Sequence, residues 1–152
     1  MNERPHRSFG ALLIPALAVA LLGCDRIGGG DRPARVPREV VFQRDVQPIL
    51  EIECLQCHNS KDAAKNGGLN LETRQLAFTT GKSAPVILPG NADGSLLIKV
   101  LKLEGDHPMN MPPAPDKIRG ERLEIVKQWI DEGAAWPDDV RLVRPQDWDA
   151  GE

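Results

Sequence analysis

Two cysteines and a histidine stand close together about one third of the way along the chain. They form the pentapeptide Cys54-Leu55-Gln56-Cys57-His58, which has the C-x-x-C-H pattern of covalent haem c attachment. Two sulfurs at this spacing can reach the two vinyl groups on one side of a porphyrin. The next residue can then present its imidazole to the iron. The sequence therefore predicts one covalently bound haem c, attached through Cys54 and Cys57 and ligated by His58.

The same residues admit three other interpretations. A thioredoxin-like redox pair of Cys54 and Cys57 would need a βαβ context, which the sequence does not show. A zinc site would need a fourth ligand, and His107 is the one other histidine downstream. A structural disulfide is the third interpretation. The specificity of the pentapeptide favours haem c over all three.

A proline-rich loop further along the chain could supply a sixth ligand to the iron, for which methionine and histidine are the usual donors. The loop reads His107-Pro108-Met109-Asn110-Met111-Pro112-Pro113 and contains both methionines that follow residue 23. Methionine is commonly core filler, but these two stand in a polar loop and not on an apolar stripe. We expect Met111 to be the distal ligand, in preference to Met109 and His107.

Residues 1–23 have the composition of a targeting segment. Arg4 and Arg7 precede the almost wholly apolar run Phe9–Leu22. This run is shorter than the roughly 20 residues of a transmembrane helix and suits the apolar core of a signal peptide. It ends in Leu21-Leu22-Gly23-Cys24, which resembles the lipobox of bacterial lipoproteins. We therefore expect Cys24 to be lipidated; an ordinary cleaved signal peptide and a retained anchor are the alternatives.

This interpretation accounts for all three cysteines and predicts the organisation of the chain. We expect a lipoprotein signal peptide at 1–23, a flexible tether at 24–39 rich in Gly, Pro and charge, a haem domain at 40–138, and a polar C-terminal tail at 139–152. The protein would be exported and membrane-anchored, facing the periplasm or the cell exterior. The formal net charge of −3 argues against nucleic-acid binding.

Apolar periodicity and capping residues predict helices and no sheet. Asp45 is expected to cap a first helix that leads to Cys54, and Thr73 a short helix around Arg74–Phe78. Asn91 is expected to cap a third helix that carries Leu96–Leu101. The clearest helix contains Leu123, Val126 and Ile130 on one face and Ile125 and Trp129 on the next, and Gly133 would end it. The predicted fold class is a small all-α domain.

The haem itself is expected to fill much of the interior, because the chain has few aromatic residues. The candidates for its apolar walls are Leu69, Leu71, Leu97, Val100 and Trp129, some of which could instead pack helix against helix. The second ring nitrogen of the haem-ligating histidine is expected to donate to a backbone carbonyl in the 67–69 loop.

An ordered set of short motifs resembles the planctomycete-type cytochrome c domain over nearly all of residues 40–137. These motifs are Phe42…Asp45-Val46-x-Pro48-Ile49-Leu50, the C-x-x-C-H pentapeptide, Gly67-Gly68-Leu69-x-Leu71, Pro89-Gly90, Ser95-Leu96-Leu97, Met111-Pro112-Pro113 and Trp129-Ile130-x-x-Gly133-Ala134-x-Trp136-Pro137. The resemblance implies a class I-like all-α cytochrome c fold. It also implies haem attachment at Cys54 and Cys57, with His58 and Met111 as the two axial ligands.

The expected function is that of a monohaem electron carrier, or of a small haem subunit of an oxidoreductase, and not of an enzyme. Its partners would be redox proteins met at a membrane surface. Two alternatives remain open. If Met111 dissociated, an open iron with His107 as an acid could react with peroxide or small gases. The H-x-M-x-M pattern of His107, Met109 and Met111 also suits copper binding by soft ligands.

Overall fold

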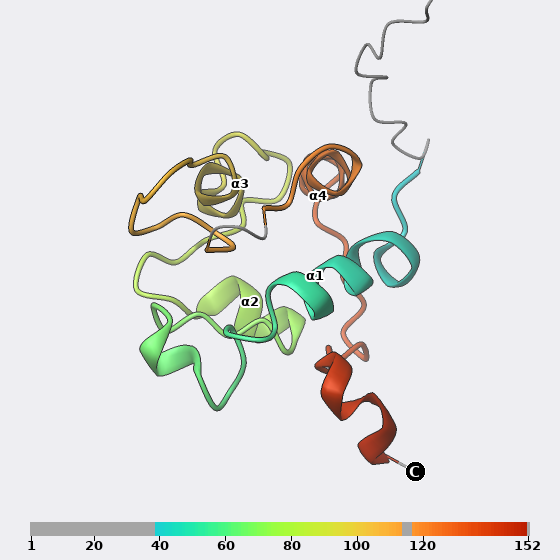
Figure 1. The fold of residues 1–152 in the computed structure, drawn as a ribbon. Coiled ribbons are helices and arrows are strands. Elements are labelled where there is room, and N and C mark those ends of the chain that lie inside the picture. The colour runs from blue at the N-terminus through green and yellow to red at the C-terminus, as the bar shows by residue number, and fades with distance from the viewer. Residues whose placement is uncertain (1–38, 114–116, 152) are drawn as a thin grey trace, which may run out of the picture. The chain divides into compact units, whose positions relative to one another are not determined.

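The computed structural model describes residues 39–113 and 117–151, all of which belong to one compact unit. The predictions for the signal peptide, Cys24 and the tether up to residue 38 lie outside the described residues. The elements along the chain are the π-helix η1 (Phe42–Val46), α1 (Gln47–Glu53), the 3-10 helix η2 (Ala63–Lys65), α2 (Arg74–Thr79), α3 (Leu96–Leu101), α4 (Glu121–Asp131) and the 3-10 helix η3 (Pro145–Gly151) (Figure 1).

The described part of the chain contains no β-strand, and its one isolated bridge pairs Thr73 with Arg141. The all-α fold class is therefore confirmed. Over the same residues, no helix combines the length and the apolar character needed to cross a membrane.

The first helix starts earlier than the capping pattern indicates. It begins with η1 at Phe42, so the prediction that Asp45 is its N-cap is wrong. Asp45 lies within the first turn, where its carboxylate accepts the backbone N–H of Val41 at 2.8 Å. Pro48 has no backbone N–H to donate. In the π-helical turn before it, the Gln47 N–H donates to the Phe42 carbonyl, five residues back.

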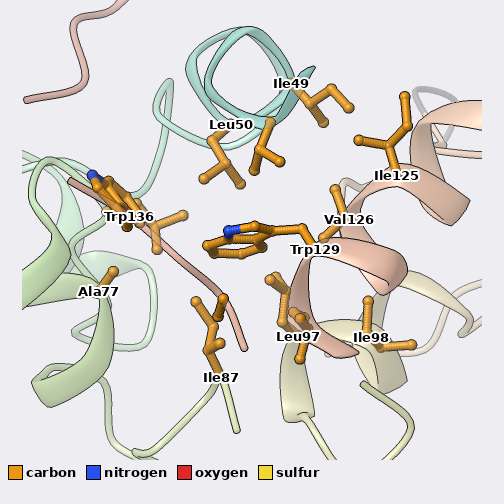
Figure 2. Packing of buried hydrophobic residues seen from close by; sticks show 14 of the residues in the cluster. Ile49, Leu50, Ala77, Ile87, Leu97, Ile98, Ile125, Val126, Trp129 and Trp136 are labelled. Carbon is orange, nitrogen blue, oxygen red and sulfur yellow. The ribbon is translucent and has the colours of Figure 1, made fainter. Parts of the chain in front are cut away.

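A cluster of aromatic rings forms the centre of the core. Trp129 on α4 is 1% exposed, and its ring centroid lies 5.7 Å from that of Phe42 and 6.2 Å from that of Trp136 (Figure 2). The Trp129 indole N–H donates to the Ala135 carbonyl at 2.8 Å, so the buried donor is satisfied. The helix ends where the sequence indicates, because Gly133 adopts a φ of +103° just after it.

The two short helices α2 and α3 begin in different ways. Thr73 caps α2 as expected, and its side chain accepts the Leu76 N–H. Asn91 does not cap α3, because residues 91–94 first form a turn in which the Asn91 side chain accepts the Gly94 N–H. The helix begins after Ser95, whose hydroxyl accepts the Leu88 N–H and donates to the Asn91 carbonyl, each at 2.8 Å.

The chain after α4 returns to the first helix. Leu142 is 2% exposed and belongs to the core cluster, so packing continues past residue 138. The next backbone N–H, that of Val143, donates to the buried Glu51 carboxylate of α1 at 3.0 Å. Trp148 on η3 remains half exposed, and its indole N–H donates to the Val143 carbonyl.

Candidate functional site

A cavity of about 490 Å³ lies beside the C-x-x-C-H segment, within the size range of small-molecule and cofactor sites. Its lining includes Cys54, Cys57, His58 and Met111, the four residues predicted to hold the haem. The rest of the lining comes from Glu53, from the 65–71 and 81–86 segments, from α3 and from the 108–113 loop. The fold thus brings together residues that are more than 50 positions apart.

The C-x-x-C-H segment is a tight turn that is held by hydrogen bonds and by packing of its leucine. The turn closes where the backbone N–H of His58 donates to the Cys54 carbonyl at 3.0 Å. Leu55 is 1% exposed and anchors the turn in the core. Asn59, also buried, donates through its side-chain amide to the Leu55 carbonyl and accepts the Lys61 N–H. Both cysteines and the histidine consequently line the cavity while the leucine between them packs inward.

His58 is half-buried at the cavity wall. Burial lowers its pKa, and the backbone carbonyl of Leu69 offsets this in part. The carbonyl expected from the 67–69 loop is therefore next to the ring, although the buried Nδ1 makes no hydrogen bond with any described residue. An imidazole at a cavity wall with a buried nitrogen that the described residues leave unpaired fits a metal ligand.

The two cysteines are free thiols, so the disulfide interpretation is not supported. Burial, together with the charge of Glu53, raises the pKa of Cys54 to about 12. Catalytic C-x-x-C pairs have the opposite property, a lowered thiol pKa. Among residues 39–113 and 117–151, no three His, Cys, Asp or Glu side chains gather as a metal-binding cluster. The thioredoxin-like and zinc interpretations therefore lose support. A covalently attached haem would take the two thiols on its vinyl groups, so that of these three residues only the imidazole would bind the metal.

The proline-rich loop presents its methionines to the cavity but not its histidine. Met111 is half-buried, packs against the core cluster and donates its backbone N–H to the Val100 carbonyl of α3 at 3.2 Å. Met109 also lines the cavity but is 43% exposed. His107 is exposed and absent from the lining, and its Nδ1 accepts the Met109 N–H at 3.1 Å. Met111 therefore remains a candidate ligand at the cavity, whereas His107 does not.

Most of the expected apolar walls line the cavity. Leu69, Leu71, Leu97 and Val100 all contribute. Trp129 is not a wall residue and follows the alternative instead, because its indole is packed with Phe42 and Trp136 in the core.

Several lining residues were not found from the sequence. Val86 and Leu96 are apolar, and their positions in an extended segment and at a helix start could have suggested them. Lys65 and Lys82 gave no such signal, since lysines are ordinarily solvated at the surface. Their place in the lining depends on how the two loops fold back on each other.

Comparison with known families matches the region that builds this cavity. Residues 54–115 match the family model described as Planctomycete cytochrome C. The matched range begins at the first cysteine of the attachment turn and ends just after the Met-Pro-Pro segment. It therefore contains every residue of the cavity lining except Glu53. Together with the small helical domain, the match indicates a cytochrome c-like fold. The comparisons with curated proteins and with solved structures found no match.

Proposed function

We propose that this protein is a monohaem c-type cytochrome that carries electrons between redox proteins. The observation that carries the proposal is the shared cavity, which the two thiols of the attachment turn, one imidazole and one thioether all line. The match to a cytochrome c family over the same residues supports it independently.

The residues of the cavity fit a haem c group. Cys54 and Cys57 would form thioether bonds to its vinyl groups, and His58 and Met111 would be its axial ligands. The bound haem supplies reversible one-electron chemistry between ferric and ferrous iron. The apolar wall excludes water, which disfavours the extra positive charge of the ferric state, and a thioether ligand raises the reduction potential further.

Two features support a carrier over a haem enzyme. Met111 is held in place through its backbone bond to α3 and is followed by two prolines, which restrict the loop. His107, which an enzyme would need as an acid near the iron, lies outside the cavity lining. Held by both His58 and Met111, the haem would suit outer-sphere electron transfer through weak and transient encounters with partners.

The proposal includes a lipid anchor at Cys24. It is supported by the short apolar run and the lipobox-like Leu21-Leu22-Gly23-Cys24 sequence. A lipidated Cys24 and a tether over residues 24–39 would hold the domain at a membrane surface facing the periplasm or the cell exterior. Confinement there raises the effective concentration near membrane-bound redox partners. A Cys24→Ser variant should move from the membrane fraction to the soluble fraction, and retention in the membrane would contradict the anchor.

The decisive test is the visible spectrum of protein matured in cells that possess the haem-attachment machinery. We expect a low-spin c-type spectrum that survives acidic organic extraction, and a polypeptide mass increased by one haem. A Cys54→Ser/Cys57→Ser double variant should lose the extraction-resistant colour. Colourless wild-type protein of polypeptide mass alone would refute the proposed function.

A further inference from the structure

Two lysine side chains at the cavity have no partner for their positive charge among the described residues. Lys65 and Lys82 line the cavity, and within the described part of the chain neither ammonium group makes an ion pair or a hydrogen bond. The lining contains one carboxylate, that of Glu53, which is paired with the Arg122 guanidinium. The cavity therefore offers two free cations to whatever occupies it.

A haem brings two carboxylates with it, one on each propionate. They stand on the porphyrin edge opposite the vinyl groups, and a carboxylate at an apolar cavity needs a cation, a donor or water. Building on the proposed function, we propose that Lys82 binds a haem propionate at the mouth of the cavity, assisted by the hydroxyl of Ser83. This assigns a role to a loop that the C-x-x-C-H and Met-Pro-Pro motifs leave unexplained.

The hydrogen bonds around the two loops favour Lys82 over Lys65. Asn66, the neighbour of Lys65, donates its side-chain amide to the Cys57 carbonyl at 3.0 Å, which ties that loop to the attachment turn. The segment that carries Lys65 is thus tied directly to the attachment turn. The side-chain amide of Asn66 also donates to the Asp62 carbonyl, so it has no N–H left to bind a propionate carboxylate.

The 81–83 segment is joined to the 67–69 loop, and among the described residues no hydrogen bond links it to the attachment turn. The backbone N–H of Lys82 donates to the Gly67 carbonyl at 2.8 Å, which places the two loops side by side. Gly81 has a φ of +103°, and a Cβ built on it would lie 3.6 Å from the Leu69 Cβ and 3.7 Å from Val86 Cγ1. The glycine lets the backbone turn against these two wall residues, so that Lys82 and Ser83 follow at the rim.

The test measures the midpoint potential of the holoprotein by spectroelectrochemical titration. Removing a cation beside the haem favours ferric iron, so Lys82→Gln should raise the ferric-to-ferrous ratio at the wild-type midpoint by roughly three- to tenfold. A tenfold change corresponds to a fall of about 59 mV for one electron. Lys82→Arg keeps the charge and should stay near the wild type. Lys99→Gln is the matched control, because Lys99 is exposed on α3 and does not line the cavity.

A second readout distinguishes a bound propionate from a distant charge. A carboxylate that loses its cation ionises at higher pH. In Lys82→Gln the pH range over which the midpoint potential falls should therefore move upward, whereas in Lys82→Arg and Lys99→Gln it should not. This shift would support direct pairing.

Three outcomes would overturn the inference. Lys82→Gln could match Lys99→Gln in both readouts, or Lys65→Gln could produce the shifts in its place. Alternatively, Lys82→Gln could slow reduction by a partner protein while leaving both readouts unchanged, which would make Lys82 a docking residue. Wild-type protein without covalent haem would refute the proposed function itself, and the two failures are thereby distinguishable.

Discussion

The side chains of Gln56 and Gln146 exchange two hydrogen bonds, at 3.1 and 3.0 Å, although the residues are 90 positions apart. Gln56 lies between the two cysteines of the attachment turn, and Gln146 lies on η3. The same C-terminal segment donates the Val143 N–H to Glu51, just before the turn. The turn that would carry the haem is thus fastened by a segment outside the range matched to the cytochrome family.

Breaking the glutamine pair should loosen the turn without unfolding the domain. For Gln146→Ala we expect a loss of roughly 0.5–1 kcal/mol in the free energy of unfolding, because both partners are exposed. Hydrogen exchange should rise within residues 54–60. In a double-mutant cycle, Gln56→Ala should add little once Gln146 has been replaced. Additive effects would show that the pair does not couple the two segments.

Glu51 should matter more, because its carboxylate is buried. It is 6% exposed and accepts both the Val143 N–H and the Gln47 side-chain amide at 3.0 Å. Glu51→Ala leaves two partly buried donors unpaired and should cost about 1–3 kcal/mol in urea unfolding. Glu51→Gln keeps an acceptor oxygen and should cost less. Ile52→Ala is the control, since Ile52 is half exposed and should change stability little. A loss in Ile52→Ala as large as that in Glu51→Ala would contradict this ranking.

The sequence predicts the residues of the cavity better than it predicts the tertiary contacts that form the core. The C-x-x-C-H spacing is local, and apolar residues such as Leu97 and Val100 at helical spacing identify one wall. Trp129 shows the limit, since periodicity marks it as buried without deciding between the core and the cavity. That choice depends on Phe42 and Trp136, which reach Trp129 only in the folded chain.

Capping residues illustrate the same limit at shorter range. Thr73 caps α2 as its type predicts, while Asn91 and Asp45 are used in a neighbouring turn and inside a helix. Each of these polar side chains satisfies a nearby backbone N–H, as its chemistry requires. Which N–H it meets depends on where tertiary packing starts the helix, and that information is not local. The free lysines of the cavity rim were missed for a similar reason.

Asp45 should make the stability of the first helix depend on pH. The hydrogen bond from the Arg44 guanidinium lowers the pKa of Asp45, and the Val41 N–H acts in the same direction. A carboxyl with a lowered folded-state pKa contributes stability above its unfolded pKa, near 4, and loses it as the pH falls through the folded value. Asp45→Asn should therefore weaken the acid dependence of the thermal midpoint below about pH 4. An unchanged acid dependence would contradict this role.

Replacing Trp129 should affect stability and leave haem attachment intact. Trp129→Ala removes the largest fully buried side chain and should cost about 3–5 kcal/mol. Trp129→Phe should cost less and still yield a c-type spectrum, because the indole packs in the core and is not part of the cavity lining. Trp148→Ala is the control, as Trp148 is 53% exposed and should change stability by no more than about 0.5 kcal/mol. A perturbed haem spectrum in Trp129→Phe would place the indole against the haem after all.

Met111 should be separable from Met109 by spectroscopy. Both line the cavity, but Met111 is half-buried and its backbone is bound to α3, while Met109 is 43% exposed. Met111→Ala should abolish the charge-transfer band from thioether to ferric iron, lower the midpoint potential and let the ferrous protein bind carbon monoxide rapidly, because one axial position is then open. Met109→Ala is the matched control and should keep the band and exclude the gas. If the band persisted in Met111→Ala and vanished in Met109→Ala, the distal ligand would be Met109, and the buried position of Met111 would reflect core packing alone.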